Sequence, residues 1–341
     1  MILSYDVHDN GRQSGCEYVG SKISPIVFYY PLILSNAGDF CRLLERRFRA
    51  AGHDRPIVFK PWDCYAEEPG RDGDLFAYDG VVLSTLVNRG FLHRLPDVID
   101  VSDVFDWIHS GSRVRGQLYG VPFMVCGSFL ISRGGGDRAS VNVRDLKCSI
   151  TTTLLNEIPP YLYIMAFCHD QGRQGRYLDS VRHLEGLIKT GYADSEEKLK
   201  ANAERFLRGD CEYLLAFSED LRLLGPGDYN VYTLNFSDRA DNDLPLLFCD
   251  YISMGVHVSD EKLLDCLNLM ETVVDGGFLC DVCTAGGKLQ YMLPAVKSVY
   301  AKLAEWDPLY GKMYRIVSDP NNCVMRYAKD FYTDFHADWE R

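Results

Sequence analysis

The residue with the clearest potential for chemistry is Cys126, which lies inside an apolar stretch. It belongs to the run 118–130, where Gly120, Val121 and Pro122 lead into β-prone residues. A thiol held on a strand can meet a substrate atom at near-attack distance, as covalent catalysis requires. Such a nucleophile is expected to have a depressed pKa. The alternative is that Cys126 only packs, because free cysteine is among the most buried residue types.

Three carboxylates follow apolar runs that are typical of buried strands: Asp79, Glu219 and Asp250. A carboxyl group at the end of such a strand is partly desolvated, which raises its pKa and suits a general acid or base. Glu219 is the best candidate for that role. Asp79 and Asp250 could accept hydrogen bonds from an amino group on a heteroaromatic ligand. The competing interpretations are a helix N-terminal carboxylate for Glu219 and ordinary turn or cap residues for the aspartates.

Aromatic rings lie at the same strand ends and could stack on a planar ligand. They are Tyr29, Tyr30, Tyr65, Phe217 and Phe248. Metal and nucleotide motifs, in contrast, are not found. The histidines lack metal-ligand spacing, the Cys-x-x-Cys at 280–283 has no second pair, and no glycine-rich phosphate loop follows a strand. We therefore predict no metal site.

The first part of the chain alternates between strand and helix patterns. Apolar, β-prone runs at 26–30, 57–59 and 74–78 flank helical spacing at 40–48. This alternation predicts a doubly wound α/β lobe with a mostly parallel sheet. Ligands bind beyond the carboxyl ends of the strands in such sheets, which is where the candidate residues fall.

After Gly134–Gly136, which we interpret as a hinge, the pattern becomes more helical. Helices are predicted at 177–189, at 195–208 and at 260–274, the last with Leu263, Leu264, Leu267, Met270 and Val274 facing inward. A final helical portion is predicted from 291 to about 335. The length suits two lobes of ordinary domain size. We divide the chain into an N-terminal arm (1–20), lobe 1 (21–130 with about 250–300) and lobe 2 (131–249 with about 301–341).

Composition narrows the function classes. The 341 residues carry a net charge of −12, which argues against nucleic acid or an anionic membrane as partner. Twelve scattered cysteines are typical of reduced thiols in the cytosol. Residues 1–20 have no apolar core, so we see no signal peptide and expect a cytoplasmic protein.

An ordered set of segments resembles thiaminase I (thiamine pyridinylase), a family with the two-lobed α/β fold of group II periplasmic binding proteins. The resemblance runs from about Ile26 to about Arg326. The segments are 62–65 (WDCY), 74–79 (DLFAYD), 83–84 (LS), 90–92 (GFL), 118–122 (LYGVP) up to Cys126, 217–219 (FSE), 243–246 (DLPL) up to Asp250, and 290–295 (QYMLPA).

The resemblance implies a ligand cleft between two lobes and a base-exchange reaction. Cys126 matches the nucleophile and Glu219 the catalytic carboxylate that activates it. The thiolate would add to the pyrimidine of thiamine, the thiazole would leave from the neighbouring methylene, and a small amine or thiol would replace it. No metal or organic cofactor is implied.

The resemblance also assigns the ligand-binding residues. Asp79 and Asp250 match aspartates that hold the aminopyrimidine, Tyr65 matches an active-site tyrosine, and either Tyr29 or Tyr30 matches another.

The chain departs from the family at several of these positions. Phe217 and Phe248 replace tyrosines, Lys200 aligns near a further tyrosine, and Ser128 replaces an asparagine two residues beyond the nucleophile. Losing a hydroxyl that a substrate uses can change substrate preference greatly. Two alternatives therefore stay open: the same Cys/Glu chemistry on another heteroaromatic substrate in a biosynthetic pathway, and a solute-binding protein without catalysis.

Overall fold

The computed structural model describes residues 23–31, 36–96, 98–134, 138–154, 174–225, 227–236, 247–322 and 324–339. The arm expected at 1–20 and two residues of the expected hinge, Gly135 and Gly136, lie outside them. The strands are β1 (Ile26–Pro31), β2 (Ile57–Trp62), β3 (Leu75–Asp79), β4 (Arg113–Val114), β5 (Gln117–Leu118), β6 (Val121–Arg133), β7 (Ser140–Asn142), β8 (Ile150–Thr152), β9 (Tyr213–Phe217), β10 (Tyr229–Asn235), β11 (Leu247–Met254) and β12 (Leu293–Pro294).

The described residues include helices at the four predicted positions 40–48, 177–189, 195–208 and 260–274, together with short 3₁₀ turns. The helices are α1 (Ala37–Ala50), α2 (Leu83–Asn88), α3 (Asp106–Gly111), α5 (Gln174–Leu187), α6 (Glu196–Arg208), α7 (Leu221–Leu224), α8 (Asp260–Val273), α9 (Gly276–Cys283), α10 (Val299–Ala304), α11 (Leu309–Val317) and α12 (Phe331–Trp339). The 3₁₀ turns are η1 (Gly80–Val82), η2 (Val143–Asp145), η3 (Ser218–Asp220) and η4 (Ala285–Gly287).

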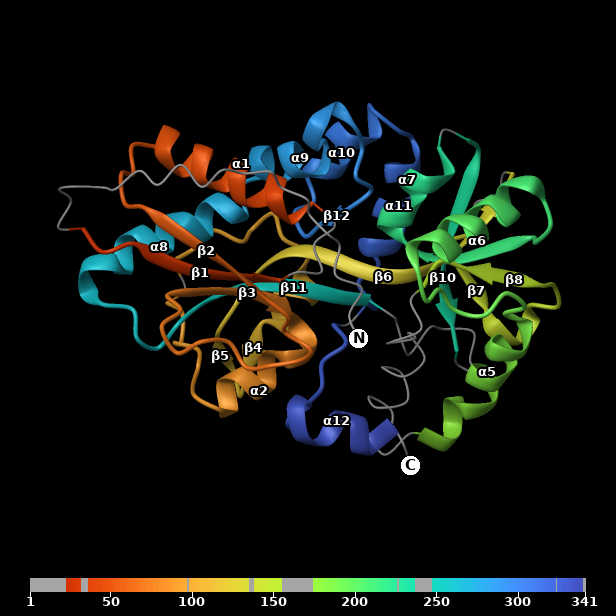
Figure 1. The fold of residues 1–341 in the computed structure, drawn as a ribbon, viewed down its shortest axis with the longest axis horizontal. Helices are drawn as coiled ribbons and strands as arrows, with labels where there is room; N and C mark the ends of the chain where they lie inside the picture. Colours follow the sequence, from red (N-terminus) through yellow and green to blue (C-terminus); the bar gives the residue numbers. More distant parts are fainter. Residues whose placement is uncertain are drawn as a thin grey trace.

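One long strand, β6, organises the molecule. It crosses the centre of the ribbon in Figure 1 and belongs to both halves of the main sheet. Its first part pairs with β11 and β12, and its last part pairs with β9 and β10. The sequence prediction of a strand carrying Cys126 is confirmed, because apolar and β-branched residues continue for 13 positions.

The sheet is mixed, so the prediction of a mostly parallel sheet is wrong. β1 pairs in parallel with β2 and β3, as the strand–helix alternation indicates. β11, however, pairs antiparallel with both β3 and β6. β11 returns to the first half from a distant part of the chain, and its direction could not be read from local periodicity.

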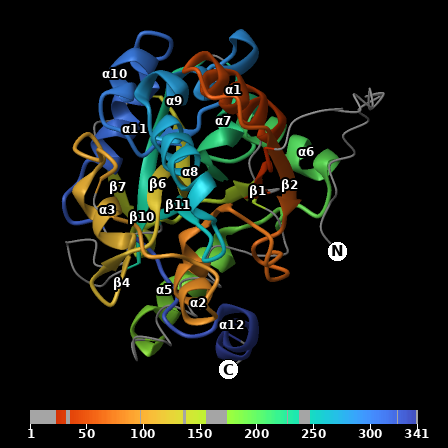
Figure 2. The ribbon, with the colours of Figure 1, turned by 90° about the vertical axis from the view of Figure 1, so that its left-hand side faces the viewer.

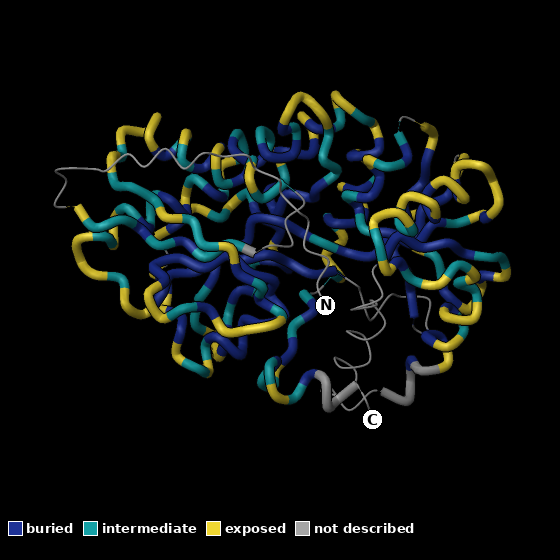
Figure 3. Tube along the Cα trace, in the orientation of Figure 1, coloured by how far each residue is buried: buried dark blue, intermediate teal, exposed yellow. Residues whose placement is uncertain are grey.

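Helices cover the first half of the sheet on both faces. Figures 1 and 2 place α1, α9 and α10 on one side and α2 on the other. Between them, β3 and β11 are buried along their whole length (Figure 3). No helix of the described residues is long and apolar enough to cross a bilayer.

The helix predictions hold in position but not in every detail. α6 begins after Ser195, whose hydroxyl accepts a hydrogen bond from Lys198 N, and it ends at the left-handed Gly209. In α8 the predicted inward face is wrong for Leu263 and Leu264, which are 40% and 69% exposed, and confirmed for Met270, which is buried. The buried stripe of α8 consists of Cys266, Leu269, Met270 and Val273.

The region from 291 onward begins with a strand, not the predicted helix. Leu293 pairs with Val125, because β6 offers an open edge there. The last segment then returns to α2: Arg89 binds both carboxylate oxygens of Asp330, at 2.7 and 2.9 Å. Phe331 N donates to Thr85 Oγ1 at the start of α12.

Candidate active site

Cys126 lies at the point where β6 changes its neighbours. In register, Cys126 is opposite Phe248 of β11, whereas Ser128 is opposite Phe217 of β9. Residues opposite each other in an antiparallel pair share a face, as do alternate residues of one strand. Cys126, Ser128, Phe217 and Phe248 therefore occupy one face of the sheet, at the boundary between its two halves.

Two aspartates extend this face into the first half. Asp250 is opposite Asp79 across β11 and β3, and it is opposite Met124 across β11 and β6. The sequence predicted that Asp250 directly follows a strand. Asp250 instead lies in the middle of β11, because pairing with β3 continues the strand to Met254. Directly opposite side chains have Cβ atoms about 5 Å apart, so the two carboxyl groups are neighbours.

Asp79 has two hydrogen-bond donors. The Tyr65 hydroxyl donates to Oδ2 at 2.7 Å, and Val81 N donates to Oδ1 at 2.9 Å, which caps η1. Burial nonetheless raises the pKa of Asp79 to about 6, since desolvation outweighs both bonds. This carboxyl group therefore titrates close to neutrality.

Asp250 has no hydrogen bond or ion pair to its carboxylate among the described residues, although it is only 6% exposed. Burial raises the pKa of Asp250 well above its usual value, and the charges of Asp79 and Glu219 raise it further. A buried carboxyl group without a protein partner, beside two other carboxyl groups, is an unfavourable arrangement in the free protein. Such a group is a candidate for contact with a ligand.

Glu219 comes from the second half, in η3 directly after β9. The Ser218 hydroxyl donates to Glu219 Oε2 at 2.9 Å, and burial raises the pKa of Glu219. The turn is held by Asp220, whose carboxylate accepts from Thr153 Oγ1 at 2.7 Å and from Phe217 N at 3.3 Å. Asp220 and Ser218 are supporting residues that sequence reasoning missed; a run of three polar residues after an apolar strand was the available signal.

The thiol of Cys126 is half-buried and surrounded by negative charge. Its pKa lies well above the usual value, first because of burial and then because of Glu219, Asp250 and Asp79. The expected depressed pKa is therefore wrong, because the charges that act on the thiol belong to carboxylates. In the free protein Cys126 is protonated at neutral pH, and it needs a base before it can act as a nucleophile.

The two tyrosines of β1 separate. Phe28 is opposite Leu75, so Tyr30 shares the face of Asp79 whereas Tyr29 lies on the opposite face. The Tyr29 hydroxyl donates to Asp72 at 2.8 Å, and its ring stacks on Phe76. The structure therefore brings Tyr30 toward the candidate site and leaves Tyr29 outside it.

The C-terminal segment supports Tyr65, a role that sequence reasoning missed. The ring of Phe331 lies 6.1 Å from that of Tyr65, and the Tyr332 hydroxyl donates to the carbonyl of Cys64 at 3.1 Å. Nothing in the local pattern of residues 324–339 indicates this contact, because it joins segments more than 260 positions apart.

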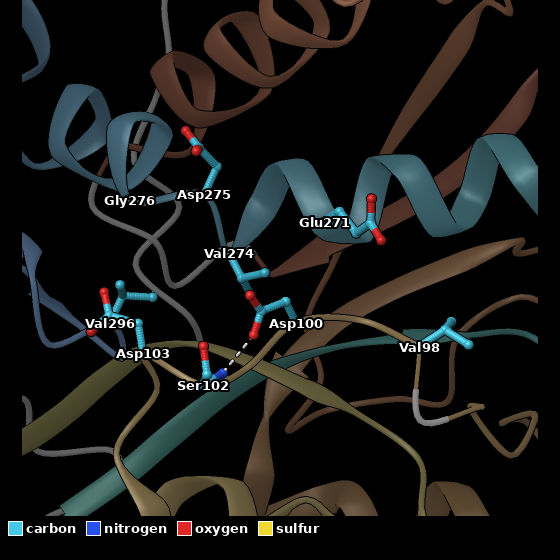
Figure 4. A pocket seen from close by; sticks show the side chains of 9 residues that line it. All are labelled: Val98, Asp100, Ser102, Asp103, Glu271, Val274, Asp275, Gly276 and Val296. Carbon is cyan, nitrogen blue, oxygen red and sulfur yellow. Dashed lines mark hydrogen bonds between the residues drawn. The ribbon is translucent and has the colours of Figure 1, made fainter.

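A separate cavity of about 410 Å³ lies between residues 98–103 and the end of α8 (Figure 4). Its aspartates cap backbone turns: Asp100 accepts from Ser102 N, Asp103 from Ser298 N and Asp275 from Phe278 N. Their carboxylates do not converge in Figure 4. Within the described residues no group of histidine, cysteine and acidic side chains could hold a metal ion. This cavity shares no residue with the face around Cys126.

Comparisons with known proteins support the resemblance and the fold. No family model matches the chain. Thiaminase-1 of Paenibacillus thiaminolyticus is 26% identical, over 97% of this chain and 90% of that protein. Clostridium botulinum thiaminase I in complex with thiamin has a similar structure, with a TM-score of 0.81 at 19% identity over 92% of this chain and 98% of that one. For the Bordetella ferric binding protein the TM-score is 0.64 at 14% identity, over 93% and 97% of the two chains. The resemblance to thiaminase I and the two-lobed periplasmic-binding-protein-like fold are both confirmed.

Proposed function

We propose that this chain, a homologue of thiaminase I along nearly its whole length, is a transferase that replaces the thiazole of thiamine with a small amine or thiol. The similarity over 97% of the chain supports the reaction class. The observation that carries the proposal is the set of four groups on one face: the Cys126 thiol and the carboxyl groups of Asp79, Glu219 and Asp250, whose charges act on one another.

The charge of this site fits a cationic organic ligand. Burial raises the pKa of Cys126 first, and three carboxyl groups raise it further, so the strongest charges acting on the thiol are all negative. A positive ligand stabilises the ionised forms of all three, because opposite charges attract strongly where water is excluded. Thiamine carries a permanent positive charge on its thiazolium ring. The described residues form no metal-ligand cluster, so a planar organic cation fits the site better than a metal ion.

In the proposed reaction Glu219 takes the thiol proton. The Cys126 sulfur then adds to a pyrimidine ring carbon, and one electron pair moves onto a ring nitrogen. That pair returns to break the bond between the methylene carbon and the thiazolium nitrogen, so the thiazole leaves neutral. The acceptor adds to the methylene and loses its proton, and expulsion of the sulfur restores the aromatic ring. A raised pKa makes Glu219 a stronger base for the first step.

The aspartate pair binds the aminopyrimidine in this proposal. Burial raises the pKa of both carboxyl groups, and the charge of Asp79 raises that of Asp250 further, which favours a state in which one member of the pair is protonated. The ionised carboxylate accepts from the amino group, and the protonated one donates to a ring nitrogen. Tyr65 orients Asp79, and Tyr30, Phe217 and Phe248 provide aromatic surface around the ring.

One observation favours a second candidate function: the same chemistry on a different, less polar heteroaromatic substrate in a biosynthetic pathway. Phe248 lies opposite Cys126, and Phe217 lies opposite Ser128 on the same face. Neither ring offers a hydroxyl to a ligand, where the family's tyrosines would. A substrate without the matching polar groups loses nothing at these two positions.

We also propose a cytoplasmic location and a division into two lobes. The cysteines that the structure describes are free thiols, which is typical of a reducing compartment. The proposed lobe boundary is the point where β6 exchanges β11 for β9, with lobe 1 at 21–130 and 250–300 and lobe 2 at 131–249. We assign α11 to lobe 2, because Lys312 Nζ donates a hydrogen bond to the carbonyl of Tyr229. We count 324–339 with lobe 1, through Asp330 and Phe331.

The test is intact-protein mass spectrometry and product analysis after incubation with thiamine and an amine or thiol acceptor. We expect the exchanged pyrimidine product from the wild type and none from Cys126→Ser. Cys148→Ser is the matched control, because Cys148 is also half-buried and its thiol interacts with a carboxylate, Glu212, outside this face. Thiamine left intact by the wild type would reject thiamine as the substrate. Equal activity of Cys126→Ser and wild type would reject the nucleophile.

A further inference from the structure

Ser128 is a buried residue beside the thiol whose hydroxyl has no partner. It is 2% exposed, and its Oγ makes no hydrogen bond in the described part of the chain. Buried hydroxyls rarely remain unsatisfied, because a serine side chain can rotate to reach a nearby donor or acceptor. An unsatisfied hydroxyl at a reactive site therefore points to an interaction that forms when a ligand binds.

The position of Ser128 relative to Cys126 defines what it can reach. The two residues are on the same face of β6, two positions apart, which is about 7 Å along the strand. This distance is too long for a hydrogen bond between the hydroxyl and the sulfur. It suits contact with a ring that is bonded to the sulfur and extends toward β9.

The other polar groups of the face leave one role open. The Tyr65 and Ser218 hydroxyls already donate to Asp79 and Glu219. Phe217, directly opposite Ser128, offers only an apolar ring. Among the described residues, Ser128 thus offers a buried hydroxyl next to Cys126 that is free to donate to a ligand atom.

We propose that the Ser128 hydroxyl donates a hydrogen bond to a ring nitrogen of the pyrimidine that reacts with Cys126, and so selects heteroaromatic rings with an acceptor on the β9 side. This inference rests on the proposed function and makes it more specific. Ser128 contacts the substrate, whereas its backbone belongs to the β6–β9 ladder and is unaffected by changes of the side chain.

The experiment compares thiamine with its two pyridine analogues, in each of which one pyrimidine nitrogen is replaced by C–H. Binding is measured by calorimetry in a Cys126→Ser background, which prevents turnover. The Ser128→Ala variant is compared with Ser128→Thr, which restores a hydroxyl. Ser132→Ala is the matched control: Ser132 is also buried, on the same face of β6, but its hydroxyl already bonds to that of Tyr232 at 3.2 Å.

We expect Ser128→Ala to weaken thiamine binding about fivefold, as for loss of one hydrogen bond between neutral groups. One pyridine analogue should already bind more weakly to the Ser128 protein, with no further loss in Ser128→Ala. Ser128→Thr should restore most of the affinity, and Ser132→Ala should leave it unchanged.

Two negative results are distinguishable. If thiamine binds and is exchanged but Ser128→Ala weakens all three compounds equally, or none, then the hydroxyl does not read a ring nitrogen and the Ser128 inference is overturned. If the protein with native Ser128 binds none of the three compounds, the proposed function fails and this inference fails with it.

Discussion

Replacing Asp250 with asparagine should make the protein more stable and its ligand binding weaker. Among the described residues Asp250 is buried without a hydrogen-bond partner for its carboxylate. Burial first, and then the charges of Asp79 and Glu219, raise its pKa well above the usual value, and keeping an unpaired carboxylate buried costs on the order of 3 kcal/mol. An asparagine left without partners costs about 1–2 kcal/mol in return. We expect a net gain of about 1–2 kcal/mol.

The gain in stability of Asp250→Asn over the wild type should depend on pH. A carboxyl group with a raised folded-state pKa takes up a proton on folding, so it costs nothing below its unfolded pKa near 4. The destabilisation grows as pH rises toward the folded pKa, and it persists above it. Asp250→Asn should therefore be no more stable than the wild type near pH 4 and should exceed it at pH 8, where the melting temperature should rise by about 2–4 °C.

The same substitution should weaken binding of a cation. At about 5 Å and an effective dielectric constant near 20, one carboxylate attracts a unit charge by about 3 kcal/mol. Because the raised pKa of Asp250 disfavours its ionised form, about half of this applies, which is roughly a tenfold loss of affinity for thiamine. The neutral analogue 3-deazathiamin, whose ring lacks the charged nitrogen, should lose much less. Both affinities are measured by calorimetry in the Cys126→Ser background.

Asp74→Asn is a matched control, for which we expect the opposite change in stability. Asp74 is also buried, but its carboxylate accepts from Val27 N and from Lys262 Nζ, each at 2.8 Å. Asp74→Asn leaves Lys262 without its charged partner and should destabilise the protein. The reasoning is refuted if Asp250→Asn is no more stable than wild type at pH 8, or if it weakens binding of the neutral analogue as much as that of thiamine.

Two further variants test the catalytic and aromatic residues. Glu219→Gln should fold and should bind thiamine more weakly, because one of the three carboxyl groups near the cation is lost. It should react about 10²–10⁴ times more slowly, because the thiol loses its base; a rate constant close to that of the wild type would remove Glu219 from the mechanism. The double change Phe217→Tyr and Phe248→Tyr should increase kcat/KM for thiamine by several-fold, since each hydroxyl can add a hydrogen bond; an unchanged value would favour a substrate other than thiamine.

Local pattern was sufficient for the elements that carry the site. Val121–Arg133 is a strand because its residues are apolar and β-prone, and α6 begins at Ser195 because a serine side chain caps its first turn. What local pattern could not supply is pairing between distant segments. Asp250 looked like the end of a strand, because its partner Asp79 comes from 171 positions earlier in the chain. The sequence analysis predicted a lowered pKa for Cys126 for the same reason, because local pattern does not show which distant carboxyl groups lie near the thiol.

Because the pKa of Cys126 is high, activation of this thiol depends on binding of the proposed substrate. In the free protein burial raises the pKa of the thiol and three carboxyl groups raise it further, so the thiol stays protonated and reacts slowly with oxidants and alkylating agents. A bound thiazolium places a positive charge among these groups, which lowers the cost of forming a thiolate and favours proton transfer to Glu219. The negative charge that destabilises Asp250 in the free protein then contributes to binding. On this proposal, recognition of the cation and activation of the nucleophile have a single electrostatic cause.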